Sequence, residues 1–161
     1  MMKYLLILVF LTTLTSITAD AAQGRAAIPH FIVDSSGFRT RFYLSNITNK
    51  DLEVEVDLYN IDGTLMQDDN TSTSGVVRLS PQSQTNNYSE NGGFTAKFTI
   101  APHQTVSLTL QPVTFNVGHG FIRWNQNGTR RKAMLAHGRA SRAQTSREVS
   151  WAVPINNGKS F

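Results

Sequence analysis

The chain has 161 residues, of which 40% are hydrophobic and 16% are charged, and its formal net charge is +4. This length suits a single domain with one hydrophobic core, and the composition excludes a disordered chain, a coiled coil and a collagen. The absence of cysteine excludes disulfide scaffolds, cysteine-ligated zinc, iron–sulfur clusters and thiol catalysis.

The N-terminus has the pattern of an export signal. Lys3 precedes a compact apolar run at residues 4–11, and a small-x-small cleavage pattern ends at Ala21. The apolar run is far shorter than the roughly 20 residues that a membrane-spanning helix needs. We therefore predict a signal peptide at 1–21 and one exported domain at 22–161, with no transmembrane segment in the mature chain. Export without cysteine is typical of bacterial proteins, which would be delivered to the periplasm, the cell surface or the medium.

Alternation of apolar and polar residues predicts most strands of the mature chain. A period of two puts one row of each strand in the core and the other row in solvent. The pattern is strict in four segments, 38–45, 52–59, 94–100 and 106–110. Three further strands are predicted in the last third of the chain, at 120–124, 132–136 and 150–153.

Turn residues separate these segments. The Asp62-Gly63 pair predicts a tight turn, and Asn127-Gly128 is the strongest short-range hairpin signal in the chain. We therefore expect the strands on either side of Asn127-Gly128 to pair with each other. Two polar stretches without a strand pattern, 67–74 and 80–93, are predicted to be surface loops.

The predicted fold is all-β. No segment of the mature chain has a sustained helical period, so each sheet must bury its apolar face against another sheet. This predicts a single antiparallel β-sandwich of about seven to nine strands, with a barrel as the alternative.

Two motifs resemble those of a known class of proteins. The first runs from Arg41-Phe42-Tyr43-Leu44-Ser45-Asn46 to Leu58-Tyr59-Asn60-Ile61-Asp62-Gly63-Thr64, and the second is the corner Phe98-Thr99-Ile100-Ala101-Pro102-His103-Gln104-Thr105. Together they resemble exported bacterial immunoglobulin-like sandwich domains of mostly unassigned function. The resemblance implies an immunoglobulin-like arrangement of the strands. Because the motifs are structural turns, it implies no functional residue.

The sequence contains no clear catalytic or metal-binding motif. There is no Gly-x-Ser-x-Gly elbow and no His-Glu-x-x-His motif. His119 and His137 lie on the two arms of the predicted hairpin, where the register would point them to opposite faces. The acidic residues Asp62, Asp68 and Asp69 do not fit a regular calcium loop. We therefore predict no metal and no cofactor.

One strand carries a dense row of carboxylates, at Asp51, Glu53, Glu55 and Asp57. Their spacing is near that of an inverting glycosidase pair, but a strand with one face in solvent produces the same row. We therefore predict that the protein is not an enzyme, and a secreted hydrolase remains the less favoured alternative.

Charge is unevenly distributed along the chain. Seven of the 11 acids fall between Asp51 and Asp69, whereas seven of the 15 bases fall between Arg123 and Arg147. Arginine forks suit anionic groups, and a tryptophan can stack on a sugar ring. The predicted ligand-binding residues lie on the basic hairpin, and they are Arg123, Trp124, Arg130, Arg131 and Lys132.

These observations favour a non-catalytic exported module for binding or structure. The predicted ligand is a polyanion, such as an anionic polysaccharide at a cell surface, and export argues against nucleic acid. The alternative is a structural protein that associates with itself or with another protein through its opposed acidic and basic faces.

Overall fold

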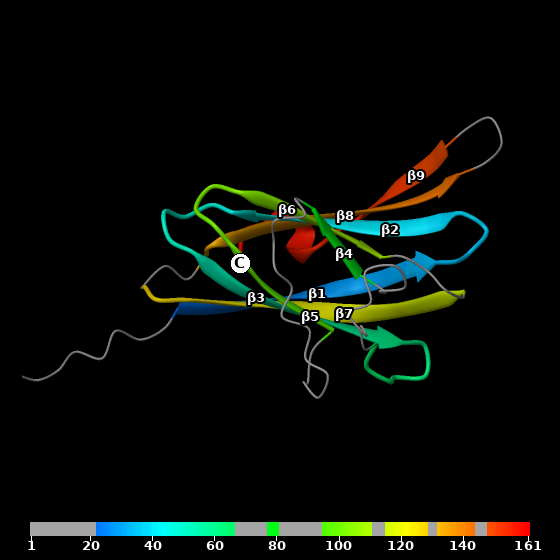
Figure 1. Cartoon of the computed structure of the whole chain (residues 1–161), viewed down its shortest axis with the longest axis horizontal. Coiled ribbons are helices and arrows are strands. Elements are labelled where there is room, and N and C mark those ends of the chain that lie inside the picture. The colour runs from blue at the N-terminus through cyan, green and yellow to red at the C-terminus, as the bar shows by residue number, and fades with distance from the viewer. Residues whose placement is uncertain (1–21, 67–76, 81–94, 111–114, 129–131, 144–147) are drawn as a thin grey trace, which may run out of the picture.

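The computed structural model describes residues 22–66, 77–80, 95–110, 115–128, 132–143 and 148–161 (Figure 1). The predicted signal peptide lies outside the described residues, as do nearly all of the two predicted loops. Within the described part of the chain, no helix is long and apolar enough to cross a membrane.

The described residues form two antiparallel sheets that pack face to face (Figure 1). One sheet has the strand order β1-β7-β3-β5, and we call it sheet A; sheet B has the order β4-β6-β2-β8-β9. This arrangement confirms the predicted all-β sandwich. The strands are β1 (Ala22–Val33), β2 (Phe38–Asn46), β3 (Leu52–Asn60), β4 (Val77–Ser80), β5 (Ala96–Ile100), β6 (Thr105–Leu110), β7 (Asn116–Gln126), β8 (Met134–Ala143) and β9 (Glu148–Val153).

The chain alternates between the two sheets from β1 to β8. The pairings are nested, because β1 pairs with β7, β2 with β6 and β3 with β5. Only β8 and β9 are both consecutive in the described chain and paired with each other. The connections between the described strands therefore mostly cross from one sheet to the other.

The predicted hairpin at Asn127-Gly128 is wrong. β7 pairs with β1 and β3 in sheet A, whereas β8 pairs with β2 and β9 in sheet B. The turn is held by other segments, since Lys50 Nζ donates to Asn127 O at 2.8 Å and Ala22 N donates to Gly128 O at 3.0 Å. His119 and His137 consequently lie in different sheets, rather than on the two arms of one hairpin.

The core lies between the sheets and contains the predicted apolar rows. In β2 the buried row includes Phe42 and Leu44, and in β3 it includes Leu52, Val54 and Val56. The Asp62-Gly63 turn is also confirmed, with Gly63 at a φ of 83° and a hydrogen bond from Gly63 N to Asn60 O. The two outer faces are therefore the surfaces on which a site can be sought.

Candidate functional site

The structure places the three described residues of the predicted basic site in different surroundings. Arg123 lies on the outer face of sheet A, where its Nη2 atom contacts Asp57 Oδ2 at 2.8 Å and Glu55 Oε2 at 3.4 Å. Lys132 is exposed just before β8, and Arg130 and Arg131 lie outside the described residues. Arg123 is thus already engaged by two carboxylates of its own sheet.

Trp124 does not form the predicted stacking surface, because its side chain points into the core. It is 2% exposed, and its Nε1 atom donates to the backbone oxygen of Phe161 at 2.8 Å. Arg123 and Trp124 are neighbours on one strand, so their side chains point to opposite faces. The prediction of a binding role for Trp124 is therefore corrected to a structural one.

Part of the acidic row of β3 is also neutralised. Lys97 Nζ contacts Glu55 Oε1 at 3.0 Å, and Arg123 bridges Glu55 and Asp57. Asp57 lies on the outer face but is only 3% exposed, so the expectation of a fully solvated row is wrong at this position. Burial removes water from this carboxylate and raises its pKa, and the nearby Arg123 guanidinium opposes that effect.

Replacing Arg123 by glutamine is expected to raise the pKa of Asp57 further. In the native protein the pKa of Asp57 is already above its ordinary value. There is therefore a pH range in which the Asp57 carboxyl is protonated in the folded state but ionised in the unfolded chain. The contribution of Asp57 to the free energy of unfolding therefore falls as the pH rises through that range, which begins near its ordinary value of 3.8.

The measurement is a carboxyl-carbon NMR titration of Asp57 in the native protein and in Arg123→Gln. Lys159→Gln, which removes an exposed cation from the C-terminal segment, is the control and should leave the titration unchanged. An Asp57 pKa that stays the same or falls in Arg123→Gln would contradict the described ion pair.

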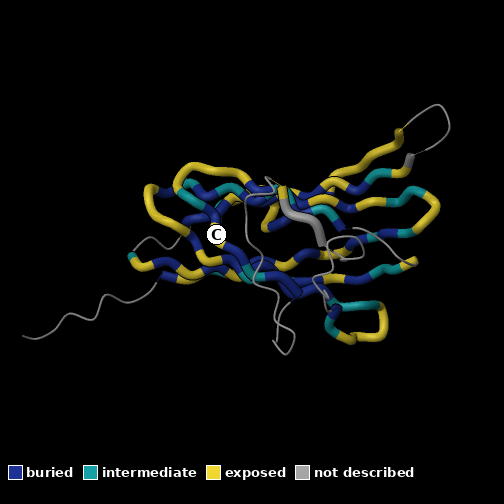
Figure 2. The backbone as a smooth tube through the Cα atoms, viewed as in Figure 1, coloured by how far each residue is buried: buried dark blue, intermediate teal, exposed yellow. Residues whose placement is uncertain are grey.

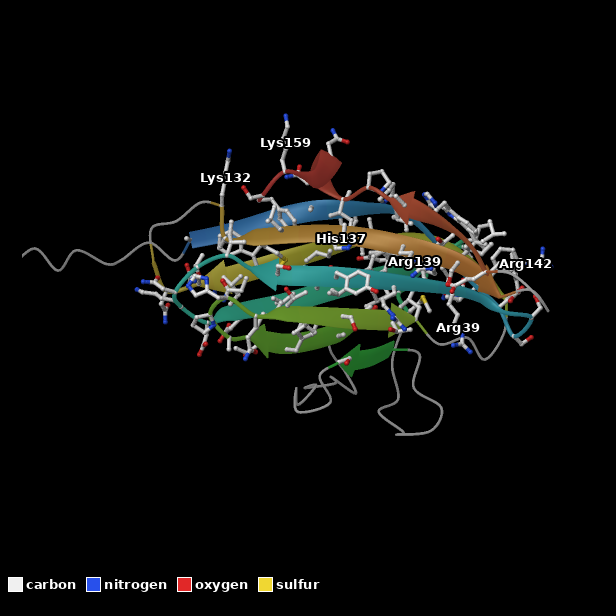
Figure 3. All side chains as sticks on the ribbon, turned by 90° about the horizontal axis from the view of Figure 1, so that it is seen from above. Arg39, Lys132, His137, Arg139, Arg142 and Lys159 are labelled. Atoms are coloured by element: carbon white, nitrogen blue, oxygen red, sulfur yellow. The ribbon has the colours of Figure 1, made fainter. Side chains whose placement is uncertain are left out.

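A hollow of about 350 Å³ on the outer face of sheet B brings together a different set of cations. We call it the arginine hollow. Figure 3 shows two of its residues, Arg39 and Arg139, toward one end of sheet B, with Lys132 toward the other end. Its lining residues come from β2, β6, β8, β9 and the turn before β2, and they are Gly37, Arg39, Arg41, Tyr43, Thr109, Arg139, Ser141 and Glu148.

The register of the strands explains why these arginines meet. Arg41 on β2 is directly opposite Arg139 on β8, and Arg39 is opposite Ser141. Directly opposite residues share a face and have Cβ atoms about 5 Å apart. Three guanidinium groups are therefore held on two adjacent strands, on the side of the sheet away from the core.

Two of these arginines are oriented by neighbours. Arg41 Nε donates to Thr109 Oγ1 at 2.9 Å, and Arg139 Nη2 contacts Glu148 Oε1 at 2.9 Å. Among the residues that the structure describes, Arg39 has no hydrogen bond or ion pair. Beside the hollow, the rings of Tyr43 and His137 stack with their centroids 4.8 Å apart. The lining thus combines three cations with one carboxylate and several hydroxyl groups.

This arrangement is suited to binding anions. A guanidinium presents a planar fork of N–H donors that matches carboxylate, sulfate and phosphate groups, and it stays charged at all relevant pH values. Within the described part of the chain, Arg39 has no hydrogen bond or ion pair, and Arg41 is engaged through its Nε alone, by Thr109, so both can bind an anion in this way. Among the described residues that line the hollow, Glu148 is the one carboxylate, and it is bound by Arg139 at 2.9 Å.

Part of this site was visible in the sequence. Arg39, Arg41 and Tyr43 alternate with core residues of the predicted strand at 38–45, which places all three on one outer face. Arg139 was missed, because its position opposite Arg41 depends on the pairing of β2 with β8. That pairing joins segments about a hundred residues apart, for which the sequence contains no local signal.

The described residues contain no group of three or more His, Asp or Glu side chains that could hold a metal ion. Comparison of the chain with protein-family models, with curated proteins and with solved structures finds no match. The immunoglobulin-like relationship therefore stays a prediction.

Proposed function

We propose that the protein is a non-catalytic exported binding module, and that the arginine hollow takes an anionic polysaccharide. The observation that carries this proposal is the meeting of Arg39, Arg41 and Arg139 in one hollow, whose described lining residues include a single carboxylate. A polymer that carries repeated carboxylate or sulfate groups would contact all three guanidinium groups at once.

The surroundings of the hollow favour a sugar polymer. It lies on the outer face of sheet B, across which an extended chain can run. Hydroxyl groups of Thr109 and Ser141 lie among the arginines, where they can hydrogen-bond to sugar hydroxyls. The predicted export signal would deliver the protein to compartments in which such polymers occur.

The test is binding to heparin, used as a model anionic polysaccharide. Arg39→Gln is expected to weaken binding about tenfold at low salt, because a charge-assisted hydrogen bond contributes about 1.5–3 kcal/mol. The native affinity should fall steeply as salt rises. Arg39 has no hydrogen bond or ion pair with another described residue, so this substitution removes a ligand contact without breaking a polar contact of the described fold.

The matched control is Arg25→Gln, which removes the same charge from the exposed outer face of sheet A. There the Arg25 guanidinium lies 3.8 Å from the centroid of the Phe121 ring. Binding that falls equally in both variants would show attraction to net charge alone and would contradict a site at the hollow. If the native protein does not bind heparin at low salt, the proposal is wrong.

Self-association through opposed acidic and basic faces is less well supported. Glu55 and Asp57 are held by Lys97 and Arg123 of the same face, so part of the acidic row is not available to a partner.

A further inference from the structure

Strand β9 is exposed to an extent that is unusual for a strand with large apolar residues. It forms one edge of sheet B, and five of its six residues are exposed. Figure 2 shows the exposure along the strand, and Figure 1 shows β9 diverging from the rest of the sandwich. Val149 is 50% exposed and Trp151 is 36% exposed, although both belong to the same row as the buried Val153.

The apolar row of β9 is part of a larger patch on the inner side of sheet B. Trp151 contacts the ring of Phe38 edge to face, with centroids 6.1 Å apart. Arg142 lies on β8 between β2 and β9, and its guanidinium is 4.8 Å from the Phe38 centroid. Val149 is directly opposite Arg142. Val149 and Trp151 remain exposed, so sheet A does not cover the part of the patch that β9 contributes.

The other described edges are protected against strand pairing, whereas β9 is not. β1 contains Pro29 within a register shift between Ile28 and Phe31, β5 has only five residues and carries Lys97, and β4 has four residues. Proline, bulges, lysine and short length are the usual devices that prevent edges from pairing. The only charge on β9 is Glu148, at its first position.

We infer that β9 pairs in antiparallel fashion with β9 of a second copy, with Ser150 opposite its own counterpart. In this register Trp151 of each copy lies directly opposite Val149 of the second copy, on the same face of the joined sheet. The two exposed apolar residues of each edge would therefore cover those of the other, and the free backbone groups of the two edges would bond to each other.

Charge complementarity favours a second copy as the occupant. In the same register Glu148 is opposite Ala152 of the second copy, and Ala152 is itself opposite Arg139 within its own sheet. Glu148, which contacts Arg139 of its own chain at 2.9 Å, would then also lie about 10 Å from Arg139 of the second copy across two strand spacings, so the junction brings the two carboxylates and the two guanidinium groups toward one another. No like charges lie directly opposite each other across the junction.

The register is tested with single cysteines, which the native chain lacks. Ser150→Cys places two thiols opposite each other on the two-fold axis, within the Cα separation of about 4.4–6.8 Å that a disulfide needs. Ala152→Cys is the control, because Ala152 is exposed on the same face but is opposite Glu148. We expect a covalent dimer for Ser150→Cys under mild oxidation, and a covalent dimer for Ala152→Cys in preference to Ser150→Cys would overturn this register.

The association itself is tested by sedimentation equilibrium of the purified chain. We expect a concentration-dependent dimer, and a monomer at every concentration up to about 100 μM would overturn the proposal. Val149→Lys should shift the equilibrium at least about tenfold toward monomer by burying a charge. Its control is Ile61→Lys, which also replaces an exposed apolar residue by lysine. Ile61 is 85% exposed and directly follows β3 of sheet A, whereas β9 belongs to sheet B. An equal shift in both variants would also overturn the proposal.

This inference does not depend on the proposed ligand. Val149 is not among the residues that line the arginine hollow, so Val149→Lys should still bind heparin as a monomer. Loss of the dimer with retained heparin binding separates the two proposals, as does a dimer that does not bind heparin.

Discussion

Replacing Trp124 by alanine is expected to lower the free energy of unfolding by about 3–5 kcal/mol, the usual cost of removing a fully buried tryptophan. Its side chain is 2% exposed and packs closely against Gly24, where even an added Cβ would lie 2.3 Å from Nε1. It also fastens the end of the chain, because the Phe161 oxygen that accepts from Nε1 also accepts from Ala133 N and Met134 N. Urea denaturation followed by circular dichroism measures the effect.

The exposed tryptophan is the control for this prediction. Trp151→Ala removes the same side chain from a site where it is 36% exposed and contacts Phe38, and it should cost about 1–2 kcal/mol in the monomer, less than Trp124→Ala. Trp124→Phe should fall between the two, since it keeps an aromatic ring in the core but loses the hydrogen bond to the Phe161 oxygen. Equal losses for the two alanine variants would contradict the burial of Trp124.

Replacing Asn46 by alanine is expected to cost about 3 kcal/mol, because it leaves several buried polar groups without partners. Asn46 is 2% exposed, and its Nδ2 atom lies within 3.1 Å of the backbone oxygens of Lys50, Ile100 and Ala101. Its Oδ1 atom accepts from both the backbone nitrogen and the hydroxyl of Thr48. One side chain thus joins the β2–β3 crossover to the β5–β6 crossover.

Asn49→Ala is the matched control, because Asn49 lies in the same crossover but is exposed. Its expected effect on the free energy of unfolding is within about 0.5 kcal/mol. The midpoint of urea unfolding distinguishes the two variants. A similar midpoint for both would mean that the buried amide is not needed to hold the crossovers.

The four strands with strict alternation were predicted with nearly their full length, and β7, β8 and β9 were predicted in part, whereas β1 and β4 were not predicted. Phe42 and Leu44 keep a period of two throughout β2, as Val54 and Val56 do in β3. In β1 the buried residues have even numbers at Ala26 and Ile28 but odd numbers from Phe31 onward, because the register shifts between Ile28 and Phe31. This shift breaks the sequence pattern on which the prediction of a strand depends. β4 has only four residues, which is too few for a pattern to show.

The candidate site was harder to predict than the fold. Which face a side chain takes is a local property, so the outward row of Arg39 and Arg41 could be predicted from the alternation. The same rule applied to Arg123 and Trp124 would have shown that adjacent strand residues cannot both face a ligand. Which strands become neighbours is not a local property. The Asn127-Gly128 pair predicted a short hairpin, but β7 lies between β1 and β3 in sheet A and does not pair with β8.

The nested order of strands also determines how this chain can acquire its structure. Apart from β8 with β9, every described pairing joins strands that are separated by at least one other strand. Long loops must therefore close before those pairings contribute any stability, and chains with such distant contacts fold on timescales of about milliseconds to seconds. During that interval the apolar rows of β2 and β3 have no cover, so the route by which the chain reaches its sandwich is slow and exposed to competing aggregation.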